Sequence, residues 1–128
     1  MEHITLPSAR SLNLPFSQAV WAGDLLFLSG AIGNRPGTLS LVEGGLAPQA
    51  HQAMENVGEV LKACGLGFAD TVKWTIMLAD MGKWAEFNAV YVGYFPDGRF
   101  PARSAFGANG LALGGEVELE CVAYAPRD

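Results

Sequence analysis

Arg103, Glu116, Glu118 and Glu120 are the residues whose types and spacing best suit chemistry in this chain. The chain has only eight basic residues, and Arg103 lies in the run Pro-Ala-Arg-Ser at 101–104. A planar guanidinium binds a carboxylate through two parallel hydrogen bonds, which a lysine ammonium does not do. A glutamate nearby can hold or deprotonate a water. The spacing therefore predicts a small pocket for an anionic molecule, with an acid beside it to move protons.

Alternating residue types predict how the three glutamates lie. In a strand, successive side chains point to opposite faces, so Glu116, Glu118 and Glu120 share one face and the apolar residues between them share the other. Neighbouring acids on that face lie about 7 Å apart, so they repel without sharing a proton. Two simpler interpretations stay open from spacing alone. Arg103 can form a structural salt bridge, and the glutamates can form a solvated strand face.

Strand-like apolar runs surround these residues. Two such runs, 19–22 and 25–29, flank Gly23-Asp24, which predicts a hairpin. Glycines mark 30–45 as a long loop or a hairpin with little core. Further strands are expected at 71–78, at 102–106 and at 116–125, the last two joined by a glycine-rich turn.

Two helices interrupt the strand series. Residues 47–64 carry an i, i+3, i+4 apolar stripe, with Pro48 suited to the first turn and Gly65 to the C-terminal stop. Residues 82–94 place aromatic side chains on one face, which predicts a second helix. The pattern indicates an α+β fold in one domain, residues 1–128, with a single mixed sheet and both helices on one face. The other sheet face then needs a cover, and contact between subunits is the natural one.

Composition and charge narrow the classes of function. Half of the 128 residues are apolar and 16% are charged, which favours an oligomer that buries part of its surface. The net charge is −5 and no basic run occurs, so binding of nucleic acid or of an anionic membrane is disfavoured. No apolar run approaches a membrane span and no signal-peptide pattern is present, so the cytoplasm is the expected location.

Other kinds of site have little support in the sequence. The two histidines, His3 and His51, are far apart and no CxxC or HExxH motif occurs, so no metal site is expected. For Cys64 and Cys121, buried thiols are the expected state, although spacing leaves a disulfide open. The serines lack histidine and aspartate partners for a hydrolase triad.

A series of motifs in order along the chain resembles the RidA/YjgF family of reactive intermediate deaminases. They are Leu-Pro-Phe-Ser-Gln-Ala-Val at 14–20, Leu-Ser-Gly at 28–30, Gln-Ala-Met-Glu-Asn-Val at 52–57, Val-Lys-Trp-Thr at 72–75, Leu-Ala-Asp-Met at 78–81, Phe-Asn-Ala-Val-Tyr at 87–91, Pro-Ala-Arg-Ser at 101–104 and Val-Glu-Leu-Glu at 117–120. Several ordered motifs at compatible spacing are more specific than any one of them.

The resemblance implies a chorismate mutase-like fold, assembled as a homotrimer with sites in the clefts between subunits. It implies hydrolysis of 2-imino acids to 2-oxo acids and ammonia, without cofactor or metal. The usual substrates are enamines and imines released by pyridoxal-phosphate-dependent dehydratases, so the implied role is control of metabolite damage. Arg103 matches the arginine that holds the substrate carboxylate, and Glu120 the acid that positions the attacking water. The residues expected to line the substrate pocket are Phe16, Ser29, Gly30, Ala31, Asn88 and Ala105.

Three pocket positions depart from the pattern of many deaminase members. Phe16 stands where a tyrosine is common, Ala31 where a glutamine is usual, and Ala105 where a cysteine is frequent. The loop from Phe106 to Gly115 is also unusually glycine-rich. These departures leave two alternatives beside imine hydrolysis. One is a non-catalytic sensor or binding protein for small carboxylates, and the other is a related small-molecule hydrolase.

Overall fold

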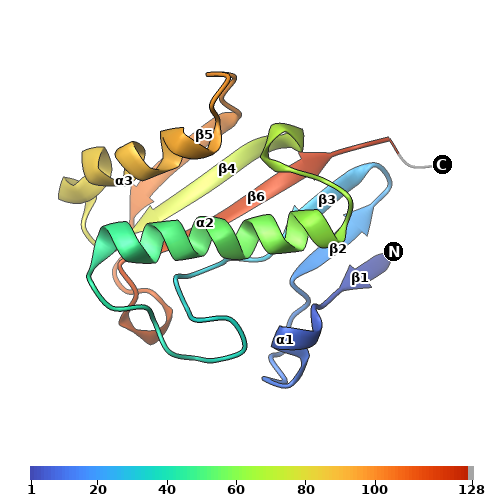
Figure 1. Ribbon diagram of the computed structural model, residues 1–128, viewed down its shortest axis with the longest axis horizontal. Helices are drawn as coiled ribbons and strands as arrows, with labels where there is room; N and C mark the ends of the chain where they lie inside the picture. Colours follow the sequence, from blue (N-terminus) through green and yellow to red (C-terminus); the bar gives the residue numbers. More distant parts are fainter. Residues whose placement is uncertain (127–128) are drawn as a thin grey trace.

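The structure is a computed structural model that describes residues 1–126, and it is built on one six-stranded sheet. The strand order is β1-β2-β3-β6-β4-β5, as the ribbon in Figure 1 shows. The strands are β1 (Glu2–Ile4), β2 (Ala19–Ala22), β3 (Leu25–Leu28), β4 (Thr71–Leu78), β5 (Ala102–Gly107) and β6 (Val117–Tyr124). β4 and β5 pair in parallel and the other neighbours pair antiparallel, so the predicted mixed sheet is confirmed.

The helices lie mainly on one face of this sheet. Figure 1 shows α2 (Leu46–Ala63) crossing the strands, with α3 (Trp84–Tyr91) beside it over β4 and β5. The second helix is shorter than the expected 82–94, because its two ends tighten into 3-10 turns, η2 (Met81–Lys83) and η3 (Val92–Tyr94). The remaining helical pieces are α1 (Pro7–Arg10), η1 (Phe68–Asp70) and η4 (Ala112–Gly114).

Local signals in the sequence account for the ends of these elements. Gly23, with φ +60°, turns β2 into β3, and the predicted hairpin is confirmed. Gly65, with φ +77°, ends α2: its N–H donates to the Lys62 carbonyl and that of Leu66 donates to the Leu61 carbonyl. This pair of bonds is a Schellman motif, which satisfies carbonyls left open at a helix end.

The core lies between the helices and the sheet. Along β6, Val117, Leu119, Cys121 and Ala123 are buried, and the residues between them are not. Large apolar side chains of β4 and α3, such as Trp74 and Phe87, fill the same layer. We call the opposite side of the sheet the open face; on β3 and β6 it carries Leu25, Phe27, Glu118, Glu120, Val122 and Tyr124.

The two closing strands are not neighbours. The sequence predicts strands near 102–106 and 116–125 joined by a turn, and both strands form. However, β4 lies between them and pairs with each, with Trp74 opposite Arg103 on one side and Cys121 on the other. The register of β5 relative to β6 is therefore set through β4, and this decides where the candidate site residues point.

The loop between β3 and α2 is tied to the helix layer. Isolated bridges join Ala31 to Leu119 and Asn34 to Leu41, but no strand of several residues forms there. The Asn56 side-chain amide of α2 donates to the backbone carbonyls of Ile32 and Asn34 at 3.0 and 3.1 Å. These bonds fix the path of the loop that leaves the Ser29-Gly30 corner.

Candidate functional site

Arg103 lies on the helix-covered side of the edge strand β5. It is directly opposite Trp74 of β4, which is buried under α3, so the Arg103 side chain points to the same side. Pro101, just before β5, removes one backbone donor and biases the preceding residue toward an extended conformation. The arginine therefore enters its strand in a defined direction and reaches the surface of α3.

Three aromatic rings of α3 surround the guanidinium. The Cζ atom of Arg103 is 4.8 Å from the ring centre of Tyr91, 5.8 Å from that of Phe87 and 5.9 Å from that of Trp84. We call these three residues the aromatic platform. All three distances are within the range for cation–π attraction. Within residues 1–126 the guanidinium makes no hydrogen bond or ion pair, so its donors are available to an anionic ligand.

Two buried polar atoms beside the platform also lack a protein partner. They are the hydroxyl of Tyr91 and the side-chain oxygen Oδ1 of Asn88, the latter on the same helix. Burial raises the pKa of Tyr91 to about 12, although the nearby Arg103 charge acts in the opposite direction, so the phenol is neutral at physiological pH. Ala105 follows on the same side of β5 and packs against the core. Arg103, Asn88 and Ala105 therefore lie on one side of the sheet.

Glu118 and Glu120 lie on the open face. In β6 they stand opposite Met77 and Thr75 of β4, whose neighbours Trp74 and Ile76 are buried on the other side. Glu120 is exposed and Glu118 is half-buried. The Glu118 carboxylate lies in the space that a side chain at Gly30 would occupy, so the two positions are in direct contact.

Ser29 and Phe16 lie on two segments that hydrogen bonds from Ser29 join; one of them runs from its N–H to the Gln18 carbonyl at 2.9 Å. The Ser29 hydroxyl donates to the Ser17 carbonyl at 2.5 Å, and Phe16 directly precedes Ser17 with 51% of its surface exposed. The Ala31 side chain packs against the core instead, and both of its backbone hydrogen-bonding groups are engaged by Leu119. Ala31 therefore supplies no polar group for a ligand.

Within one chain, Arg103 and Glu120 do not share a pocket. The spacing predicts a single small pocket with an arginine and an acid, but Glu120 pairs with Thr75 and Arg103 with Trp74, which are successive residues of β4. Successive strand residues point to opposite faces, so the two groups lie on opposite sides of the sheet.

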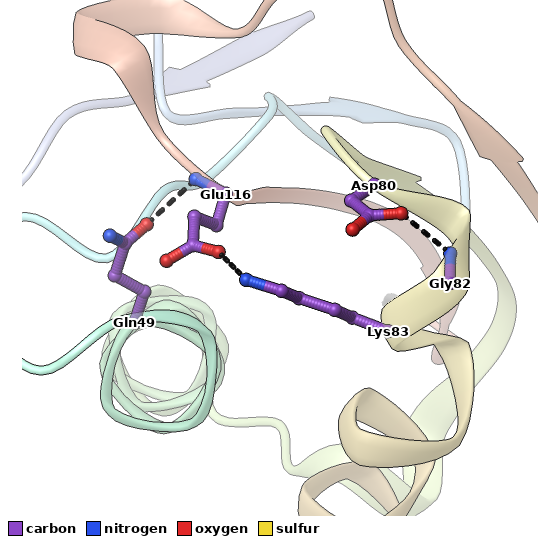
Figure 2. Close-up of polar contacts among 5 residues, drawn as sticks. All are labelled: Gln49, Asp80, Gly82, Lys83 and Glu116. Atoms are coloured by element: carbon purple, nitrogen blue, oxygen red, sulfur yellow. Dashed lines mark hydrogen bonds and ion pairs between the residues drawn. The ribbon is translucent and has the colours of Figure 1, made fainter.

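Glu116 does not belong to the same face as Glu118 and Glu120, contrary to the strand pattern. Its backbone precedes β6, and its carboxylate pairs with the Lys83 ammonium of η2 at 2.5 Å, the contact drawn in Figure 2. Its N–H donates to the side-chain oxygen of Gln49 of α2 at 2.9 Å. The ion pair raises the pKa of Lys83. Glu116 therefore joins the two helices to the sheet, and only Glu118 and Glu120 remain as open-face acids.

Replacing Glu118 by glutamine is expected to stabilise the protein at neutral pH. Burial, and secondarily the Glu120 charge, raise the pKa of Glu118 above its usual value near 4.5. A raised pKa means that the folded state binds the proton more tightly, so this carboxylate lowers stability as pH rises through the interval between the unfolded and folded pKa values. The gain for Glu118→Gln is expected to be below about 1 kcal/mol because solvent screens a half-buried group.

Denaturant unfolding of both proteins from pH 3.5 to 8 measures this effect. The difference in unfolding free energy should be largest at high pH and should vanish below the ordinary glutamate pKa. If the gain in unfolding free energy is equal at all pH values, titration of Glu118 is not its cause. Asp80, whose carboxylate accepts from the Gly82 N–H in Figure 2, gives the comparison variant Asp80→Asn, which removes one negative charge away from the open face.

Residues 1–126 offer little support for other kinds of site. No group of three or more histidine, cysteine, aspartate or glutamate side chains there is arranged to hold a metal ion. No helix in that range is long and apolar enough to cross a membrane. Cys64 and Cys121 are not joined by a disulfide; Cys121 is buried in β6, where burial raises its pKa to about 12, and Cys64 is half-buried at the end of α2.

Sequence reasoning did not identify Tyr91 as part of the site. Its place in the aromatic stripe of 82–94 indicates a core residue, and it is indeed buried. The signal that it contacts Arg103 is the pairing of β5 with β4, which brings the Pro-Ala-Arg-Ser run beneath α3. That pairing cannot be read from either segment alone.

Comparisons with known proteins match nearly the whole chain. Residues 8–125 match the family described as Endoribonuclease L-PSP. The chain is 44% identical over 109 residues to the 2-iminobutanoate/2-iminopropanoate deaminase of Bos taurus, covering 85% of this chain and 79% of that protein. Among solved structures, it is 34% identical to RidA from the Antarctic bacterium Psychrobacter sp. PAMC 21119, with a TM-score of 0.89 over 98% of this chain and 100% of that one.

The YjgF gene product of E. coli is similar as well, with 32% identity and a TM-score of 0.88 over 97% of this chain and 98% of that chain. The resemblance drawn from the sequence motifs is thus confirmed over nearly the whole chain. On the match of residues 8–125 and these identities, the protein belongs to the Endoribonuclease L-PSP family, that of the RidA and YjgF proteins.

Proposed function

We propose that this protein hydrolyses reactive 2-imino acids to 2-oxo acids and ammonia. The observation that carries the proposal is the Arg103 guanidinium, which is fixed over three rings and makes no polar contact within residues 1–126. Such a group suits a substrate carboxylate. The relatives named 2-iminobutanoate/2-iminopropanoate deaminase act on substrates that carry one.

Hydrolysis of an imine requires that the substrate be oriented and that one acid–base group transfer protons. Arg103 holds the carboxylate and so presents the imine carbon. Glu120 takes a proton from a water as the water oxygen bonds to the carbon of the protonated imine, giving a neutral carbinolamine. Glu120 then returns this proton to the nitrogen, the C–N bond breaks and ammonia leaves. As the C=O bond forms, the hydroxyl proton passes to Glu120, which releases it to the departing ammonia or to solvent. One water is consumed for each 2-oxo acid and ammonia released.

The site proposed is shared between subunits of a homotrimer. Arg103, Asn88 and Ala105 lie on one side of the sheet, and Glu120, Gly30 and Ser29 lie on or beside the open face. Two copies of the chain must meet for both sets to reach one substrate. The open face is suited to such contact, because it exposes large apolar side chains, including Phe27 at 46% and Tyr124 at 48%.

The fold and setting proposed follow from family membership. We take the subunit as chorismate mutase-like, the trimer as the assembly and the cytoplasm as the location, with metabolite damage control as the role. The net charge of −5 and the two open-face glutamates argue against an RNA substrate, which the family's description as an endoribonuclease would suggest, because these charges repel phosphates. Light scattering of the purified protein should give a mass about three times that of one chain.

The activity is tested by generating an imine in place. An amino-acid oxidase produces 2-imino acids from amino acids, and the release of ammonia and 2-oxo acid is followed with and without this protein. Acceleration over the spontaneous rate supports the proposal. No acceleration, with tight calorimetric binding of a 2-oxo acid, would identify a carboxylate sensor instead. The exposed Phe16 and the engaged Ala31 favour that second candidate, since neither offers a polar group to a reacting molecule.

Mixing two inactive variants tests the shared site directly. We expect Arg103→Ala and Glu120→Gln each to be inactive, and a sample unfolded and refolded at a 1:1 ratio to recover about a quarter of wild-type activity. In randomly assembled trimers, half of the shared sites receive Arg103 from a Glu120→Gln subunit. Half of those sites receive Glu120 from an Arg103→Ala neighbour, so one site in four carries both residues. The arrangement is supported if activity returns when the two variants are refolded together, and does not return when folded trimers that exchange no subunits are mixed. A refolded mixture without activity would place both residues in one chain's site.

A further inference from the structure

The guanidinium of Arg103 is held by contacts of an unusual kind for a residue that must bind an anion. An arginine side chain has many rotamers, and hydrogen bonds or ion pairs usually select one of them. Here no such bond exists within residues 1–126, and the aromatic platform is the contact that remains. Tyr91 is nearest, with its ring centre 4.8 Å from Cζ.

Tyr91 is itself held firmly. Only 3% of its surface is exposed. Its ring meets Trp74 edge-on, with ring centres 5.9 Å apart and planes at 86°, and it packs against Phe95 at 4.9 Å and Phe87 at 5.7 Å. Trp74 is in turn fixed by a 2.8 Å hydrogen bond from its indole N–H to the Thr71 hydroxyl. The ring under Arg103 therefore belongs to the rigid core.

The other two rings of the platform are less suited to set the arginine's position alone. Trp84 lies at the start of α3 with 47% of its surface exposed, so it has room to move. Phe87 is fully buried, but its ring centre is 1.0 Å farther from Cζ than that of Tyr91, 5.8 against 4.8 Å. Cation–π attraction weakens with distance.

We propose that Tyr91 is a positioning residue for Arg103: its ring, and not its hydroxyl, fixes the guanidinium so that its donors face the substrate carboxylate. This inference rests on the proposed function and adds a residue to that site. The hydroxyl has no hydrogen-bond partner, so it contributes no bond through which it could hold Arg103. A ring without the hydroxyl should therefore serve, and an aliphatic side chain of similar size should not.

Kinetics on two variants of Tyr91 test this distinction. For Tyr91→Leu we expect KM for 2-imino acids to rise about tenfold, the loss typical of a desolvated cation–π contact, with kcat changed less. For Tyr91→Phe we expect KM within about twofold of wild type, since the ring remains. Hydrolysis of an imine without a carboxylate should respond to neither change.

A matched control separates positioning from general damage to the aromatic core. Phe68 stacks on Trp74 and packs against Tyr94 and Phe95, but no ring contact joins it to Tyr91 or Arg103. Phe68→Leu should therefore lower the melting temperature as Tyr91→Leu does, yet leave KM near the wild-type value. A rise in KM as large as that of Tyr91→Leu would make the effect merely structural and overturn the proposal.

A measurement without turnover keeps this inference distinct from the proposed activity. In NMR spectra, protons of the Arg103 side chain above an aromatic ring should be shifted upfield in wild type and in Tyr91→Phe, and should move toward random-coil values in Tyr91→Leu. If the wild-type protein shows the upfield shift but does not hydrolyse imines, the proposed function is contradicted, whereas the placement of Arg103 by the Tyr91 ring is supported. Unchanged shifts in Tyr91→Leu, or a loss in Tyr91→Phe equal to that in Tyr91→Leu, would overturn the inference itself.

Discussion

Replacing Arg103 by alanine is expected to lower kcat/KM for 2-imino acids by at least about 100-fold. A hydrogen bond to a charged group contributes about 1.5–3 kcal/mol, and a bidentate carboxylate contact has two of them. A loss of 2.8 kcal/mol already corresponds to about 100-fold. Because the carboxylate is bound before and during the reaction, most of the change should appear in KM. Arg103→Lys should recover part of the loss, since an ammonium keeps the positive charge but lacks the paired donors that bind a carboxylate through two parallel hydrogen bonds.

Arg99→Ala is the control for this experiment. Arg99 is exposed in the turn just before β5, so its removal changes the net charge equally without touching the aromatic platform. Steady-state rates of ammonia release for the three variants are compared at one ionic strength. An Arg103→Ala protein with wild-type kcat/KM, or an Arg99→Ala protein equally impaired, would show that Arg103 does not bind the substrate.

Glu120→Gln is expected to reduce kcat by about 100- to 10,000-fold, the usual contribution of a positioned general acid–base group. Glutamine has nearly the same shape, and its amide can still hold a water by a hydrogen bond, but it cannot accept or return a proton. KM should therefore change little. This pattern is the opposite of that for Arg103→Ala, so the two variants separate substrate capture from proton transfer.

Glu59→Gln provides a matched control, because Glu59 is exposed on α2 and lies outside both halves of the candidate site. Rates are taken as oxo-acid release over the spontaneous background, and single-turnover experiments isolate the chemical step from product release. A Glu120→Gln variant that keeps full kcat would remove Glu120 from the mechanism. It would then direct attention to Glu118, the other open-face acid.

Much of the fold could be predicted because several elements carry strong local signals. The apolar stripe, Pro48 and Gly65 locate α2 to within one residue at each end, and the run 71–78 matches β4. β1 and α1 were not predicted, since a three-residue edge strand and a single helical turn bury almost nothing and leave no periodic pattern. The aromatic pattern overestimates the length of α3, because the helix is flanked by 3-10 turns with similar side-chain spacing.

The site could be predicted residue by residue but not in its arrangement. Alternation within β6 correctly places Glu118 and Glu120 on one face. It cannot show which residues of β5 point to which face of the sheet. That orientation depends on pairing with β4, a strand about 30 residues away in sequence. The alternating pattern includes Glu116 in the strand because a pattern does not show where pairing begins, and the Lys83 ion pair is a contact of the tertiary structure.

Trp84 gives the protein an optical reporter of its own. Of its three tryptophans, Trp21 and Trp74 are buried, whereas Trp84 has its indole partly in water and 5.9 Å from the Arg103 guanidinium. Emission from a water-exposed indole is red-shifted relative to that from a buried one, so light emitted at the long-wavelength edge comes mainly from this ring. An anion arriving at Arg103 changes both the charge and the hydration beside it. Ligands can thus be titrated by intrinsic fluorescence, without a label and without waiting for a product.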